Sequence, residues 1–157
     1  MKKLEESVVK LLTEKNLTVA FAESCTGGLV AKRITDVSGA SQVFCCGVVS
    51  YSNEVKVKVL GVDSEIIKQN GAVDSEVAKQ MALGVRKIVG DDIGIGITGI
   101  AGPDPSENGK PAGLIYIALA YEDKVVCTKL TTGCSDRDKN RLSASDCALE
   151  MILKEVR

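Results

Sequence analysis

The sequence has no histidine and no tryptophan among its 157 residues, and none of its six cysteines forms a Cys-x-x-Cys pair. Without histidine, no imidazole can act as a base or a nucleophile activator. The two absences together also argue against a structural zinc site, since zinc is held by cysteine and histidine. We therefore expect no metal in this protein, and any general base must be another type of side chain.

The chain also has no excess of positive or negative charge, and it has few aromatic residues. The net charge is −1, no block of lysine or arginine occurs, and aromatic residues make up 3% of the chain. Binding to nucleic acid depends on a basic surface and on stacking, so neither a DNA nor an RNA partner is expected.

Long apolar stretches are missing as well. No stretch reaches the roughly 18 residues that a membrane span needs, and glutamates at positions 5 and 6 interrupt what would be the apolar part of a signal peptide. The sequence therefore predicts no membrane partner and a cytoplasmic location, where the cysteines stay free thiols.

The chain is long enough for one domain with its own core, and we expect a single domain over 1–157. Hydrophobic periodicity, caps and turn residues predict helices over 2–15, 29–35, 53–60, 63–69, 74–89 and from 136 onward, and strands over 17–22, 43–51, 92–98, 113–120 and 124–132. Strands that alternate with helices, plus one hairpin, are typical of a three-layer α/β/α sandwich. Its sheet is expected to be mixed and mostly parallel.

Small polar residues gather in four clusters beside the predicted strands, at 23–28, 38–41, 51–56 and 98–102. In open α/β sheets, ligands bind beyond the ends of the strands. We therefore expect the four clusters to converge on one cleft.

Two of these clusters contain glycine turns. Gly27 and Gly28 open a helix and could present N–H groups to an anion. A helix cap by Ser24 or Thr26, with the glycines allowing the turn, explains the same residues equally well. The small side chains of 98–103 would let a substrate or an oxyanion approach the backbone. A tight turn explains the same residues equally well.

Lys56 and Cys25 are the two candidates for altered reactivity. A lysine in an apolar cleft has a lowered pKa and can act as a general base for a serine, whereas a lysine on a helix is more often a solvated surface charge. Cys25 lies at a helix N-terminus, a setting that favours thiolate. With no histidine to pair with, it ranks below serine as the nucleophile.

The clusters together resemble the CinA C-terminal-domain family, the nicotinamide mononucleotide deamidases also called PncC. The resemblance covers nearly the whole chain in order, through AESCTGG at 22–28, D-x-x-G-A-S at 36–41, YSNEVK at 51–56, LGV at 60–62, NGAV at 70–73, TGIAGP at 98–103 and SDRD at 135–138. The chain is similar to a stand-alone member of that family. It departs from the family pattern at Cys45 and Cys46, at Asp74 and at Ser135.

The resemblance implies hydrolysis of the carboxamide of nicotinamide mononucleotide, a phosphorylated pyridine nucleotide, with no metal or organic cofactor, and a homo-oligomer is plausible. By position, Ser41 matches the nucleophile and Lys56 its base, while Ser24 and Arg137 match residues needed for activity. A guanidinium at Arg137 suits the substrate phosphate. The remaining residues that the resemblance places in the site are Tyr51 and Asn53 beside the lysine, with Thr26, Gly27, Gly28, Thr98, Gly99, Ala101 and Gly102 facing the substrate.

Two other functions stay open at this point. The same fold could carry a non-catalytic domain that binds a pyridine nucleotide or regulates a partner, since a fold does not determine chemistry. The protein could also be an amidase for another small carboxamide. Contact between Arg137 and a phosphate would distinguish this last possibility.

Overall fold

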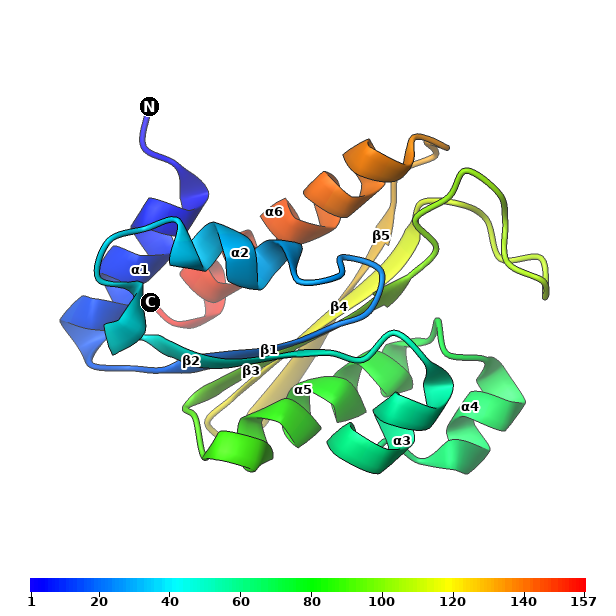
Figure 1. The fold of residues 1–157 in the computed structure, drawn as a ribbon, viewed down its shortest axis with the longest axis horizontal. Helices are drawn as coiled ribbons and strands as arrows, with labels where there is room; N and C mark the ends of the chain where they lie inside the picture. The colour runs from blue at the N-terminus through cyan, green and yellow to red at the C-terminus, as the bar shows by residue number, and fades with distance from the viewer.

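Five strands form a single sheet with helices on both faces, as seen in a computed structural model that describes residues 1–157 (Figure 1). The elements are α1 (Leu4–Lys15), β1 (Val19–Glu23), α2 (Leu29–Thr35), a short 3₁₀ helix η1 (Ala40–Gln42), β2 (Phe44–Val49), α3 (Asn53–Leu60), α4 (Ser64–Asn70), α5 (Ser75–Val89), β3 (Ile93–Gly99), β4 (Leu114–Tyr121), β5 (Lys124–Thr131) and α6 (Arg137–Glu155). Every helix and strand expected from the sequence is present.

The strand order across the sheet is β2-β1-β3-β4-β5. β1 pairs in parallel with both β2 and β3, while β4 pairs antiparallel with β3 and with β5. Four strands therefore run in one direction and β4 alone runs in the other. The mixed sheet with a β4–β5 hairpin is confirmed, and its four pairings divide equally into two parallel and two antiparallel.

Two helical layers cover the sheet, with α1, α2 and α6 on one face and α3, α4 and α5 on the other (Figure 1). The main hydrophobic core, a cluster of 23 buried residues, lies on the side of α1, α2 and α6. On the opposite face α5 packs directly against the strands. The backbones approach so closely that a Cβ at Gly96 would lie only 2.3 Å from the carbonyl oxygen of Ala78, and the absence of a side chain at Gly96 permits this contact. The three-layer α/β/α sandwich is thus confirmed.

The central strands β1 and β3 bring several chain segments to one edge of the sheet. Glu23, the last residue of β1, lies beside Val49 of β2 and Ile97 of β3. The segments that follow these three parallel strands therefore emerge side by side. No helix in the structure is both long and apolar enough to cross a membrane.

Candidate active site

Lys56 is buried at this edge of the sheet, with 1% of its surface exposed. It lies on α3, whose N-cap residue Ser52 accepts a hydrogen bond from the N–H of Val55. The Nζ atom of Lys56 lies 2.9 Å from the carbonyl oxygen of Ser50, 3.2 Å from that of Tyr51 and 3.1 Å from Ser24 Oγ. The alternative of a solvated surface lysine is therefore wrong.

All three hydrogen-bond partners of Lys56 are uncharged. Burial therefore disfavours the ammonium form without a carboxylate to offset it, and it lowers the pKa of Lys56 from 10.5 to about 8. An amine with that pKa is neutral in a useful fraction of molecules near neutral pH. Lys56 can consequently accept a proton from a neighbouring hydroxyl.

Ser24 lies on the tight turn between β1 and α2. Its N–H donates to the carbonyl oxygen of Ile97, and its own carbonyl oxygen accepts from the N–H of Gly27. The turn needs two consecutive residues with positive φ, 57° at Gly27 and 97° at Gly28, which favours glycine at both positions. A nucleophile presented on a sharp turn from strand to helix is a recurrent arrangement in α/β hydrolases.

A cavity of about 290 Å³ opens over the serine and the lysine. Nine of the residues predicted for the site line it: Ser24, Tyr51, Asn53, Lys56, Thr98, Gly99, Ala101, Gly102 and Arg137. Three of the four polar clusters thus converge on one cleft, whereas the fourth, 38–41, lies elsewhere. Cys25, the weaker nucleophile candidate of the sequence, also lines the cavity. The lining is completed by Ala72, Val73, Ile100 and Asp104, which the sequence did not indicate as site residues.

Backbone N–H groups beside the cavity are available for a ligand. Those of Cys25, Thr26, Ala101 and Gly102 donate to no acceptor within the protein, and three of these four residues line the cavity. Unpaired backbone donors next to a nucleophile can stabilise the oxyanion of a tetrahedral intermediate.

Arg137 forms part of the cavity rim from the first residue of α6. Its Nη1 donates to the carbonyl oxygen of Gly102 at 2.7 Å, and its Nη2 donates to Tyr51 Oη at 3.0 Å. Tyr51 is 62% exposed. The arginine therefore joins two sides of the cleft at a point where solvent, or the far end of a long substrate, can reach it.

Cys25 lines the cavity but is not the reactive thiolate that a helix N-terminus suggests. Burial raises the pKa of Cys25 to about 12, so the thiol stays neutral. The negative charge of the neighbouring Glu23 also raises the pKa of Cys25, and it opposes the helix dipole, which would lower that pKa.

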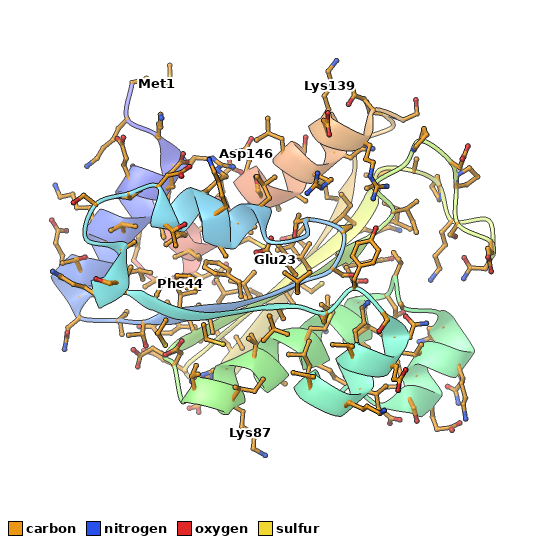
Figure 2. All side chains as sticks on the ribbon, viewed as in Figure 1. Met1, Glu23, Phe44, Lys87, Lys139 and Asp146 are labelled. Atoms are coloured by element: carbon orange, nitrogen blue, oxygen red, sulfur yellow. The ribbon has the colours of Figure 1, made fainter.

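The start of α2 is capped by Glu23. The carboxylate of Glu23 accepts hydrogen bonds from the N–H groups of Val30 and Ala31, at 2.9 and 3.1 Å, and it lies beneath α2 in Figure 2. None of Thr26, Gly27 and Gly28, which the sequence places facing the substrate, lines the cavity. The chain's own carboxylate takes the N–H groups of Val30 and Ala31 that could have bound an anion, whereas the N–H of Thr26 has no acceptor in the protein. The alternative cap by Ser24 or Thr26 is wrong.

Ser41 lies away from Lys56, and the predicted Ser41–Lys56 pair is not formed. Ser41 belongs to η1, which precedes β2, whereas Lys56 follows it. The six residues of β2 span roughly 20 Å, and Figure 2 shows Phe44 and Glu23 at opposite ends of the β1–β2 pair. Ser41 instead lines a separate cavity with Phe44. Ser24 is the serine next to the lysine.

These features define a small α/β domain with a buried lysine and a serine paired in a cleft at the ends of parallel strands. The chain belongs to the CinA family, since the family model for the CinA C-terminal domain matches residues 1–156. It is similar to a CinA-like protein of Kosmotoga olearia, with 49% identity over 153 residues, and to a CinA-like protein of Geobacter sulfurreducens, with 44% identity over 154 residues. Each alignment covers 98% of this chain but only 37% of the relative.

A solved structure agrees with the fold over nearly the full chain. The crystal structure of the competence/damage inducible protein CihA from Agrobacterium tumefaciens superposes with a TM-score of 0.94 at 35% identity. The match covers 98% of this chain and 94% of that one.

Proposed function

We propose that this domain is an amidase that hydrolyses the carboxamide of nicotinamide mononucleotide, with Ser24 as the nucleophile and Lys56 as its base. Membership of the CinA family, and the resemblance to its deamidases, support this choice of substrate. The main support for Lys56 as a base is the set of three hydrogen-bond partners around its Nζ atom.

Two of these partners, the carbonyl oxygens of Ser50 and Tyr51, can only accept hydrogen bonds. A neutral amine would satisfy them with its two N–H bonds. Its lone pair is then left for the third partner, Ser24 Oγ, whose hydroxyl can donate. The surroundings of Lys56 therefore suit a base aimed at this serine.

The reaction follows from that geometry. Lys56 accepts the hydroxyl proton of Ser24 while Oγ bonds to the amide carbon, and backbone N–H groups stabilise the oxyanion. The intermediate collapses, the carbon–nitrogen bond breaks, and Lys56 returns the proton to the departing ammonia. Water, deprotonated by Lys56, then hydrolyses the ester on Ser24 and releases the carboxylic acid.

The size of the cavity constrains how the substrate binds. About 290 Å³ lies just below the usual range for small-molecule pockets. We therefore place the carboxamide ring inside the cavity and the ribose phosphate at the rim beside Arg137, whose guanidinium suits phosphate oxygens. A homo-oligomer in the cytoplasm stays a prediction.

An assay of ammonia release tests the proposal. The purified protein is incubated with nicotinamide mononucleotide, and the acid product is separated by chromatography. We expect stoichiometric ammonia and nicotinic acid mononucleotide. Binding measured by calorimetry without any turnover would instead show a non-catalytic nucleotide-binding domain, and turnover of unphosphorylated carboxamides only would indicate an amidase for another substrate.

A further inference from the structure

The first two turns of α6 direct polar side chains at two loops of the cleft. Arg137, Asn140 and Arg141 are spaced i, i+3 and i+4, so they lie on one face of the helix. Arg137 reaches the cavity itself. The other two do not line the cavity, yet both hold the backbone of segments that do.

Arg141 joins two successive carbonyl groups of the turn that carries the nucleophile. Its Nε donates to the carbonyl oxygen of Cys25 at 3.1 Å, and its Nη2 donates to that of Thr26 at 3.0 Å. The rigid guanidinium therefore fixes the orientation of two consecutive peptide units, Cys25–Thr26 and Thr26–Gly27.

Asn140 holds the second loop in a similar way. It is fully buried, and its Nδ2 donates to the carbonyl oxygens of Ala101 and Cys134, both at 2.8 Å. Its Oδ1 accepts from the hydroxyl of Thr132. Asn140 is thus fully engaged, and the peptide unit between Ala101 and Gly102 is fixed by one of its donors.

In a trans peptide, the carbonyl and the following N–H point in opposite directions within one plane. Fixing the carbonyl of Cys25 therefore also fixes the N–H of Thr26, and fixing the carbonyl of Ala101 fixes the N–H of Gly102. Neither of these N–H groups has an acceptor in the protein. Both N–H groups therefore point away from α6, opposite the carbonyls that Arg141 and Asn140 hold.

We infer that Arg141 and Asn140 are positioning residues that orient the N–H groups of Thr26 and Gly102 toward the oxyanion of the reaction. The inference rests on the proposed Ser24 chemistry, although not on the identity of the amide. Both residues act through the backbone and touch no substrate. Oxyanion donors act only when they are aimed in advance at the developing charge, so their misorientation lowers kcat rather than substrate binding.

The test measures the reactivity of Ser24 with a fluorophosphonate, a probe that needs no knowledge of the natural amide. The serine oxygen bonds to phosphorus, the phosphorus–fluorine bond breaks, fluoride leaves, and the hydroxyl proton passes to Lys56. The phosphoryl oxygen becomes negative in the transition state, as the amide oxygen does. Intact-mass spectrometry follows the rate in the wild type, Arg141→Met, Arg141→Lys and Asn140→Ala.

Arg86→Met is the matched control, because Arg86 also donates to a backbone carbonyl, that of Glu122 at 2.9 Å, in the turn between β4 and β5. We expect Arg141→Met to be labelled roughly 100-fold more slowly than the wild type, and Asn140→Ala to be slowed as well. Arg141→Lys should recover part of the lost rate through its single ammonium. Arg86→Met should be labelled at the wild-type rate. With nicotinamide mononucleotide, the loss should fall on kcat with KM nearly unchanged.

Equal labelling rates for Arg141→Met and Arg86→Met, or a loss confined to KM, would overturn the inference. If Arg141→Met does not fold, as judged by circular dichroism, Arg141→Lys decides: a folded lysine variant with wild-type rates contradicts it. A wild type that is labelled at Ser24 but does not hydrolyse nicotinamide mononucleotide refutes the proposed substrate alone. A wild type that is not labelled at Ser24 refutes both the proposed nucleophile and the inference.

Discussion

Ser24 and Ser41 both lie next to a strand of the same parallel pair, yet at opposite ends of it, since Ser24 follows β1 and Ser41 precedes β2. Ser24 is 8% exposed, and its Oγ lies 3.1 Å from the amine of a buried lysine. Ser41 is exposed, and the cavity beside it is lined by no titratable side chain. The fold therefore places an amine beside one serine and no titratable group beside the other.

The two cavities also differ in whether they contain a group that can accept a proton. The cavity at Ser24 holds an amine whose pKa burial lowers to about 8, together with backbone donors. The cavity at Ser41 is lined by Thr35, Val37 and Phe44 among others, and it has no group that could take a proton near neutral pH. Only the first can support an attack by a serine hydroxyl.

Replacing each serine separately should give the largest difference in kcat between two variants. Ser24→Ala is expected to lower kcat by a factor on the order of 10⁴ or more, because it removes the nucleophile, whereas Ser41→Ala should stay within about twofold of the wild type. Steady-state ammonia release measures both. Loss of activity in the Ser41 variant, with activity retained in the Ser24 variant, would reverse the comparison.

The two lysines of α3 sharpen the role of the base. Lys56→Met should lower kcat by roughly 10²- to 10⁴-fold, the usual contribution of general acid–base catalysis. Lys58 lies on the same helix but is exposed and paired with Glu54, so Lys58→Met should be silent. The same ammonia assay, with thermal unfolding to confirm that both variants fold, checks this prediction. Equal effects in the two variants would argue against a base at Lys56.

Arg137 should matter for the phosphate rather than for the amide. Arg137→Gln is expected to raise KM for nicotinamide mononucleotide by about 10- to 100-fold, the value of a lost hydrogen bond to a charged group. With nicotinamide riboside, which lacks the phosphate, the same substitution should change KM little. Kinetics on this substrate pair measures the difference, and an equal rise for both substrates would place the phosphate elsewhere.

The smallest expected effect is the pH dependence of the wild type. The active form of Lys56 is the neutral amine, so kcat/KM should rise with pH and reach half of its plateau near pH 8, the lowered pKa of Lys56. At pH 7 about one tenth of the lysine is neutral, which predicts a value about tenfold below the plateau. A profile that falls between pH 7 and pH 9 would contradict a lysine base.

The fold could be predicted from the sequence because its local signals agree. β1 and β3 are apolar runs that become strands buried throughout, except at Gly99, the last residue of β3. The acidic residue Asp74 caps α5 by accepting from the N–H groups of Glu76 and Val77. The order of the strands had no such signal, since it depends on contacts between segments far apart in the chain.

The site could be predicted only in part. The segment 38–41 precedes β2 whereas 51–56 follows it, so the strand predicted over 43–51 already separates the two, and the Ser41–Lys56 pair implied by the resemblance conflicts with that strand. The partner of Glu23 was hidden, because it consists of backbone N–H groups seven and eight residues further along. Burial of Lys56 could not be read from its helix, where exposed charges lie two residues away on either side.

The most direct test of the account is to trap the acyl-enzyme and locate it. After a rapid acid quench with nicotinamide mononucleotide, trypsin should release Ser24 in the peptide 16–32 and Ser41 in the peptide 34–56. Mass spectrometry then shows which peptide carries the acyl group. We expect the adduct on Ser24 in peptide 16–32, and an adduct in peptide 34–56, at Ser41, would rule out Ser24 as the nucleophile.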